Sequence, residues 1–221
     1  MERGTILAEL IEIGIVPVIR AHTAEAAIRC VDAIWRGGIR AAEITMTVPR
    51  AISVLERAAD EFGDRMVVGA GTVLDPETAH GCVLAGAAFF VTPSLDVRTI
   101  EVAKRYSKVI MPGALTPTEV LTAWEGGGDA VRIVPCDALG GAKYIRALRG
   151  PFPHIQMVAT GGVRLETIGD FLYAGACAVG VSGALVDIQN LRAGHYEVFT
   201  ERARRFRDAI QQARESMPLS L

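Results

Sequence analysis

Residues 66–91 read MVVGAGTVLDPETAHGCVLAGAAFFV, and this stretch predicts two strands with a helix between them. The apolar run Met66 to Gly69 is typical of a strand buried on both faces. Asp75-Pro76-Glu77 supplies a helix cap followed by proline at the first helical position. Gly86 then ends the helix before the next apolar run, Ala88 to Val91. The stretch therefore predicts one β–α–β unit.

Runs of the same kind recur along the whole chain at intervals of roughly 20 to 26 residues. The eight runs are Ile15 to Ile19, Ala41 to Thr45, Met66 to Gly69, Ala88 to Val91, Val109 to Met111, Ala130 to Val134, Ile155 to Val158 and Ala178 to Val181. Segments with helical periodicity lie between them, and Thr116 to Glu119 has the spacing of a capping box. Eight β–α units allow either a closed barrel or an open, doubly wound sheet. Short strand-to-helix connections, and no GxGxxG after the first strand, favour an α/β fold with a single (β/α)8 TIM barrel over residues 1–221 and an N-terminal helix.

Composition narrows the class of protein. Half of the 221 residues are hydrophobic and the net charge is −2, with no lysine/arginine tract, which argues against a nucleic-acid partner. No uncharged apolar stretch reaches about 18 residues, so no membrane span is expected. The N-terminal segment carries Glu2, Glu9 and Glu12 and reads as an amphipathic helix, not as a signal peptide. Four scattered cysteines without a CxxC pair indicate a reducing compartment, and we expect a cytoplasmic protein.

The active site of such a barrel lies at the C-terminal ends of its strands. The small and polar residues expected there include Arg20, Glu43, Thr45, Thr47, Thr72, Pro93, Arg132, Thr160, Gly161, Gly162, Ser182 and Gly183. Glu43 lies within an apolar run, where poor solvation raises the pKa of a carboxyl group and suits it to proton transfer. Alternatively, Glu43 forms a structural ion pair with Arg20, Arg40 or Arg132.

Arg132 and Arg20 each allow two interpretations. Arg132 lies in the sixth run, and a buried guanidinium needs a carboxylate or phosphate partner. That partner is either an anionic ligand or Glu43, in which case the pair merely fills the barrel. Arg20 follows the first run and either binds an anionic substrate or caps a helix terminus.

Glycine turns follow the last two strands. Thr160-Gly161-Gly162 comes after the seventh run and Ser182-Gly183 after the eighth, where this fold commonly cradles phosphate on backbone N–H groups. The alternative is a pair of plain tight turns. The histidines show no metal-ligand spacing, and Cys136 has no partner base, so neither a metal, a cofactor nor a cysteine nucleophile is expected.

At these residues the chain resembles the 2-keto-3-deoxy-6-phosphogluconate (KDPG) and 4-hydroxy-2-oxoglutarate (KHG) aldolase family. The resemblance covers almost the whole chain. The shared blocks include Gly14 to Arg20, Gly37 to Ile39, Glu43 to Thr47, Val68 to Val73, Gly86-Ala87, Thr92-Pro93, Met111 to Gly113, Pro135, Gly140-Gly141, Gly150 to Phe152, Thr160 to Val163 and Ala174 to Ala176. The resemblance implies a homotrimer of barrels that cleaves a 2-keto acid into pyruvate and an aldehyde.

The resemblance also implies roles for single residues. Glu43 matches the glutamate that shuttles protons in the family. Thr72, Pro93, Thr160, Gly161 and Gly162 match residues that shape the sites for pyruvate and phosphate. The partner is accordingly expected to be a small 2-keto acid or sugar phosphate.

One departure from the family pattern concerns the chemistry itself. The family's Schiff-base lysine stands three residues before a proline, and here that position holds Arg132, followed by Pro135. A guanidinium stays protonated and is no usable nucleophile. The remaining lysines, Lys104, Lys108 and Lys143, fall on helical segments or at the closed end of the barrel.

Three functions remain open from the sequence. The first is an aldolase-family lyase that is impaired or mechanistically altered, with Arg132 binding a carboxylate or stabilising an enolate. The second is an imine-independent enolising isomerase or decarboxylase. The third is a non-catalytic binder of keto acids or sugar phosphates.

Overall fold

The computed structural model describes residues 3–216, and within this range nine strands form one parallel sheet. The strands are β1 (Ile15–Ile19), β2 (Ala41–Thr45), β3 (Val67–Gly71), β4 (Phe89–Val91), β5 (Val109–Met111), β6 (Gly113–Ala114), β7 (Val131–Ile133), β8 (Met157–Thr160) and β9 (Ala178–Val181). Their order, β5-β4-β3-β2-β1-β9-β8-β7-β6, begins and ends on two segments that only Pro112 separates. The sheet is therefore closed, and the predicted (β/α)8 barrel is confirmed, with its fifth strand divided in two at Pro112.

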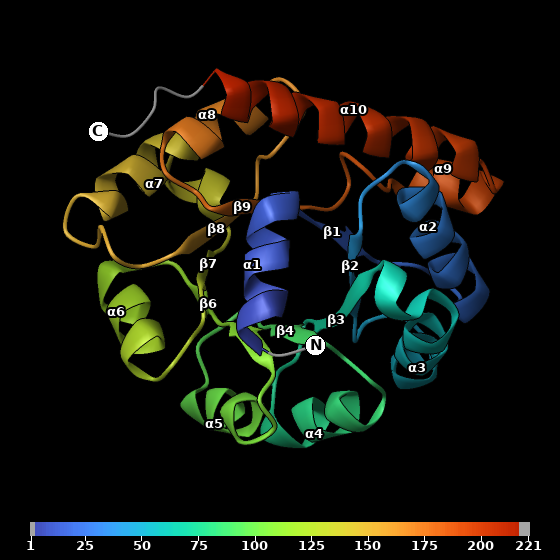
Figure 1. Cartoon of the computed structure of the whole chain (residues 1–221), viewed down its shortest axis with the longest axis horizontal. Helices are drawn as coiled ribbons and strands as arrows, with labels where there is room; N and C mark the ends of the chain where they lie inside the picture. The colour runs from blue at the N-terminus through green and yellow to red at the C-terminus, as the bar shows by residue number, and fades with distance from the viewer. Residues whose placement is uncertain (1–2, 217–221) are drawn as a thin grey trace.

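Helices surround the strands, as Figure 1 shows. Within the described residues they are α1 (Arg3–Ile13), α2 (Ala24–Arg36), α3 (Ala51–Phe62), α4 (Pro76–Leu84), α5 (Val97–Arg105), α6 (Pro117–Glu125), α7 (Ala142–Arg149), α8 (Ile168–Tyr173), α9 (Ile188–Ala193) and α10 (Tyr196–Glu215), with 3₁₀ turns η1 (Gly63–Arg65) and η2 (Cys136–Leu139). The caps predicted at Asp75 and Thr116 are present, because each side chain accepts a hydrogen bond from the backbone N–H three residues on, and Thr23 caps α2 in the same way. In the part of the chain described, no helix is both long and apolar enough to cross a membrane.

The strand predicted at Ile155 to Val158 lies two residues later in the structure, as β8 (Met157–Thr160). Ile155 is fully buried, which explains its strand-like appearance in the sequence. Its backbone groups are bonded within the preceding loop instead, since its N–H donates to the carbonyl of Phe152 and its carbonyl accepts from Arg149 Nη1 at 3.0 Å. Ile155 is therefore buried but not hydrogen-bonded to a neighbouring strand, and for this reason the sequence pattern placed the start of the strand two residues too early.

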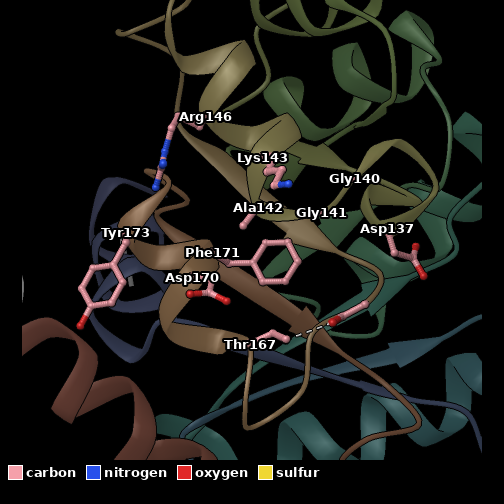
Figure 2. A pocket seen from close by; sticks show the side chains of 11 residues that line it. Asp137, Gly140, Gly141, Ala142, Lys143, Arg146, Thr167, Asp170, Phe171 and Tyr173 are labelled. Carbon is pink, nitrogen blue, oxygen red and sulfur yellow. Dashed lines mark hydrogen bonds between the residues drawn. The ribbon is translucent and has the colours of Figure 1, made fainter.

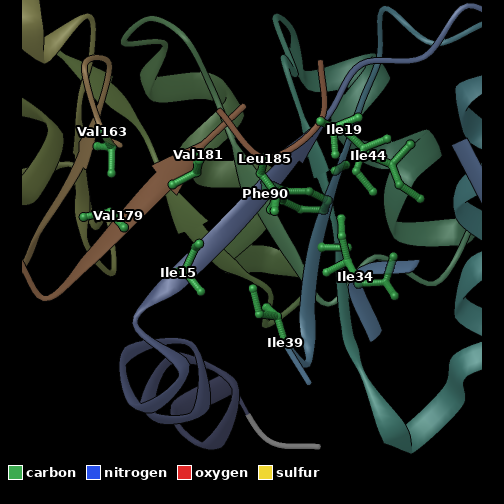
Figure 3. Close-up of a cluster of buried hydrophobic side chains, with 14 of the residues drawn as sticks. Ile15, Ile19, Ile34, Ile39, Ile44, Phe90, Val163, Val179, Val181 and Leu185 are labelled. Carbon is green, nitrogen blue, oxygen red and sulfur yellow. The ribbon is translucent and has the colours of Figure 1, made fainter. Parts of the chain in front are cut away.

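Two apolar layers give the barrel its core. Outward-facing residues such as Ile15, Ile19 and Ile44 pack against the surrounding helices (Figure 3). A second cluster fills the lower interior, and it consists of Ile6, Leu10, Val16, Ala41, Val67, Phe89, Val91, Val109, Met111, Ala130, Val158 and Ala178. Ile6 and Leu10 belong to α1, so the predicted N-terminal helix closes the amino-terminal end of the barrel (Figure 1).

The alternation of side chains along each strand also places polar side chains inside the barrel, near the carboxyl ends of the strands. Side chains two residues apart on a strand point to the same face of the sheet. Ala41, Ala130 and Val158 fill the lower interior, so Glu43, Arg132 and Thr160, each two residues on, also point inward. These three side chains form a polar layer above an apolar one, near the carboxyl ends of β2, β7 and β8.

Candidate active site

Arg132 on β7 is held by two side chains from other strands. Its Nη1 donates to both carboxylate oxygens of Glu43, at 3.1 Å to Oε1 and 2.9 Å to Oε2. Its Nε donates to Oγ1 of Thr160 at 3.0 Å. Glu43 is 1% exposed and Arg132 6% exposed, so the ion pair is almost dry. Of the three partners that the sequence left open for Glu43, the structure selects Arg132.

Two glycines leave the space that Glu43 and Thr160 occupy, and each lies on the strand next to the side chain concerned. A Cβ added at Gly71 on β3 would lie 1.9 Å from Oε1 of Glu43. A Cβ added at Gly180 on β9 would lie 2.3 Å from Oγ1 of Thr160. Gly71 ends β3 and Gly180 lies within β9, and glycine in a strand costs conformational entropy, so close packing against the polar layer is the physical reason for glycine there.

Replacing Gly71 with alanine is expected to destabilise the protein by about 1–3 kcal/mol, because the new methyl group displaces the Glu43 carboxylate. Urea unfolding would measure the change. Gly81→Ala is the matched control, since Gly81 lies in α4 and a Cβ there would meet nothing closer than the Cδ1 of Ile52, at 3.6 Å. We expect that control to be neutral or slightly stabilising. Equal losses in both variants would contradict the packing role of Gly71.

The electrostatics of Glu43 depend on its burial. Loss of water raises the pKa of Glu43 above that of an ordinary glutamate, while the charge and hydrogen bonds of Arg132 and the more distant charge of Arg20 lower it. The net direction is upward, because the whole carboxyl group has left water whereas only one guanidinium bonds to it. The carboxyl group can therefore gain a proton closer to neutral pH than an exposed glutamate does.

A cavity of about 340 Å³ opens beside this pair at the carboxyl ends of the strands. It is lined by Val18, Arg20, Arg132, Val134, Asp137, Thr160, Gly161, Gly162, Val163, Arg164, Gly180, Ser182, Gly183 and Ala184. Three of these are arginines and one is an aspartate, so the cavity favours anions. Within residues 3–216, the backbone N–H groups of Gly161, Gly162, Gly183 and Ala184 donate to no backbone carbonyl. These groups are available to a ligand.

The structure separates the predicted site residues into two sets. Arg20, Arg132, Thr160, Gly161, Gly162, Ser182 and Gly183 line the cavity. Glu43 lies behind Arg132 and is not among the lining residues. Thr45 joins strands, since its Oγ1 donates to the carbonyl of Ile19 at 3.0 Å and lies 2.7 Å from Oγ1 of Thr47.

Two further residues lie outside the cavity wall. Thr72 adopts a left-handed backbone conformation with φ of 56° in the loop after β3. Pro93 packs its backbone against Gly113, where an added Cβ would lie 2.5 Å from the carbonyl carbon of Pro93. Neither lines the 340 Å³ cavity, so their roles in a site stay predictions.

Arg164 and Asp137 line the cavity and were not predicted. Arg164 comes two residues after the Gly161-Gly162 turn, and Asp137 comes two residues after Pro135. In the sequence, both are charged residues that follow a predicted strand. The sequence analysis did not select them because they lie beyond the last residue of the apolar run. Asp137 contacts the glycine turn closely, because a Cβ at Gly161 would lie 2.5 Å from its Oδ1.

None of the chain's three lysines, all of which lie in the described range, lines this cavity. Lys104 pairs with Asp129 at 3.7 Å, and Lys108 directly precedes β5 at the amino-terminal end of the barrel. Lys143 lines a separate cavity of about 470 Å³ between α7 and α8, with Phe171 and Asp170 on the facing helix (Figure 2). Burial raises the pKa of the Cys136 thiol to about 11, so at neutral pH the group is a thiol and not a thiolate.

Comparison with known proteins gives consistent matches. Residues 6–201 match the family model of KDPG and KHG aldolase. The 2-dehydro-3-deoxy-6-phosphogalactonate aldolase of Escherichia coli K12 is 33% identical over 175 residues, covering 79% of this chain and 85% of that protein. The 2-dehydro-3-deoxy-phosphogluconate aldolase of Haemophilus influenzae is 35% identical over 170 residues, covering 76% and 78%.

A solved structure shares the whole fold. It is KDPG aldolase from Legionella pneumophila, with pyruvate captured at low pH as a covalent carbinolamine intermediate. Its TM-score with this chain is 0.83 at 26% identity, covering 92% of this chain and 97% of that one.

Proposed function

Because the chain belongs to the KDPG and KHG aldolase family, we propose that it is a lyase of anionic 2-keto acids that works without a Schiff base. Its substrate is a 2-keto-3-deoxy sugar acid phosphate or 4-hydroxy-2-oxoglutarate, and its products are pyruvate and an aldehyde. The observation that carries the proposal is the cavity wall, to which Arg132 contributes a guanidinium and no lysine of the described chain contributes an amine.

The chemistry needs an electron sink beside the keto group. Retro-aldol cleavage breaks the bond between C3 and C4 while the C4 hydroxyl gives its proton to Glu43, released from Arg132 for this step. The electron pair moves onto the pyruvate fragment as an enolate, which then takes the proton back at C3 to give pyruvate. A cation with hydrogen-bond donors stabilises the enolate oxygen in a dry site. Arg132 lines the cavity and can supply both, since Nη1 and Nε bond to Glu43 and Thr160 and leave Nη2 as the nitrogen for a ligand.

The other residues that line the cavity suit the end of such a substrate that carries the phosphate or the second carboxylate. Arg20 and Arg164 add two further cations, and the glycine turns after β8 and β9 add free backbone N–H groups. Arginine forks and backbone amides together are a common cradle for phosphate or carboxylate. We therefore place the phosphate of the substrate between the two turns.

A second candidate is a non-catalytic binder of the same ligands. The observation in its favour is that both carboxylate oxygens of Glu43 are bonded to Arg132 and Glu43 does not line the cavity. In this state Glu43 positions Arg132 and has no direct path to a substrate proton. A lyase therefore requires Glu43 to be released from Arg132 during the reaction.

Exchange of the methyl protons of pyruvate in D2O distinguishes these candidates. We expect the wild-type protein to catalyse the exchange, measured as loss of the methyl signal by NMR, because enolate formation is the reverse half of the lyase reaction. Glu43→Gln is expected to slow it by about 100-fold or more. Cleavage of KDPG with release of pyruvate would separate the lyase from an enolising isomerase or decarboxylase. Tight binding of pyruvate without any exchange would instead establish the binder.

A further inference from the structure

We propose that Arg132 couples the binding of a carboxylate in the cavity to the uptake of one proton by Glu43, with Thr160 as the residue that positions the guanidinium. The carboxylate in question is that of a 2-keto acid such as pyruvate, which rests on the proposed function. Glu43 thereby takes up a proton when a ligand is present, and proton abstraction from bound pyruvate uses the fraction of complexes in which Glu43 is still ionised.

The geometry allows a ligand to reach Arg132 but not Glu43. Glu43 is enclosed by Arg132 on one side and by the backbone of Gly71 on another, where an added Cβ would lie 1.9 Å from Oε1. Arg132 bonds to Glu43 through Nη1 and to Thr160 through Nε. Because two of its three nitrogens are fixed by the protein and Arg132 lines the cavity, the remaining nitrogen, Nη2, is the one left for a ligand. Nη2 carries two N–H groups, so a ligand carboxylate binds there beside its neighbouring keto oxygen, at 6% exposure of Arg132, in a largely water-free site.

The charges around Glu43 make a second carboxylate costly. Two charged groups of the described chain act on Glu43, namely Arg132 on β7 and, at longer range, Arg20 at the end of β1. β3 contributes only the uncharged backbone of Gly71, and Thr45 on β2 carries no charge. Without ligand, Glu43 and Arg132 form a neutral pair. A ligand carboxylate adds one negative charge to a buried guanidinium that already serves one carboxylate, and two carboxylates sharing a site favour protonation of one of them.

The proton goes to the more buried carboxyl group. Free ligand has an ordinary carboxyl pKa well below neutral, whereas burial already raises the pKa of Glu43. A proton from water therefore binds to one oxygen of Glu43 while the other still accepts from Nη1 of Arg132. The balance is a neutral ion pair, one ligand anion and one proton on one side, and a neutral complex with protonated Glu43 on the other.

The pH dependence of binding is a consequence of linkage. The pKa of Glu43 is higher with ligand than without it, so affinity is greatest below the ligand-free pKa. As pH rises from that pKa to the ligand-bound pKa, the Kd increases by up to about tenfold per pH unit. Above the ligand-bound pKa the Kd becomes constant again. An ordinary arginine–carboxylate contact without a linked glutamate would have no such window near neutral pH.

Calorimetric titration with pyruvate tests the coupling. The titration is made in pairs of buffers with different ionisation enthalpies, over a pH range from about 5 to about 9, and yields both the Kd and the net proton uptake. In the wild-type protein we expect uptake that approaches one proton within the window. Glu43→Gln is expected to bind pyruvate with a pH-independent Kd and no uptake.

Control variants separate Glu43 from other groups. Asp137 is the other carboxylate that lines the cavity, so Asp137→Asn should keep the uptake. Thr160→Val should weaken binding by about fivefold to tenfold through loss of the Nε acceptor, yet keep the uptake, and Thr160→Ser should restore the affinity.

The outcomes are distinct. Pyruvate binding by the wild-type protein without proton uptake overturns the coupling, as does uptake that persists in Glu43→Gln and disappears in Asp137→Asn. Should Glu43→Gln fail to fold, the wild-type and Asp137→Asn titrations still decide. If pyruvate does not bind, acetate serves as the probe: uptake with acetate keeps the coupling and rejects the proposed substrate class, and binding of neither anion rejects both.

Discussion

Replacing Arg132 with methionine is expected to destabilise the protein by about 3–5 kcal/mol at about pH 8. The loss arises because Glu43, 1% exposed, keeps its place with no counter-charge, and an unpaired buried carboxylate is far more costly than the ion pair it came from. Equilibrium unfolding in urea would measure it. The deficit should shrink as pH falls, because the folded variant then takes up a proton on Glu43 whose pKa is raised further by the loss of Arg132.

The double variant Glu43→Leu/Arg132→Met is the matched control for that prediction. It removes both charges and keeps apolar volume, so we expect it to recover most of the lost stability, since replacing a whole buried pair is often neutral. Arg57→Met provides a surface comparison. Arg57 bonds to Glu25 and Glu61 with all three side chains exposed, and its loss should change the free energy of unfolding only slightly. A similarly small change at Arg132 would mean that water reaches Glu43.

The second large effect concerns covalent chemistry. Wild-type protein incubated with pyruvate and borohydride is expected to yield no trapped adduct, whereas Arg132→Lys is expected to yield one. A guanidinium keeps its proton and forms no imine, but a lysine amine at this position would face the same cavity in a desolvated site, where burial favours the neutral, nucleophilic form. Intact-protein mass spectrometry would detect the reduced pyruvate, and peptide mapping would assign it.

The control for trapping is Arg132→Gln, which removes the guanidinium without adding an amine. An adduct in that variant, or in the wild-type protein, would place an imine on Lys104, Lys108 or Lys143. Lys108 is the lysine to examine first, because burial lowers its pKa, although it lies at the opposite end of the barrel. Such an adduct would contradict the proposal that this chain works without a Schiff base.

Much of the fold could be predicted because its signals are local. The Asp75 and Thr116 caps and the repeating apolar runs define β–α units without reference to distant residues. The break at Pro112 and the late start of β8 were not predictable from the runs, because burial and ladder pairing are separate properties. Ile155 is buried in a loop and looks like part of a strand.

For the candidate site, the sequence determined which side chains lie inside the barrel. The two-residue repeat that buries Ala41, Ala130 and Val158 also turns Glu43, Arg132 and Thr160 inward. The resemblance to the family also predicts that Arg132 stands at the position of the family's Schiff-base lysine.

Tertiary structure alone decided how these side chains meet. Glu43 and Arg132 are 89 residues apart, and barrel closure brings them within 2.9 Å. The choice of Arg132 over Arg20 or Arg40 depends on which guanidinium loses its water beside Glu43, and that is a property of the closed barrel. For the same reason only the structure could show that Arg132 stands between Glu43 and the cavity.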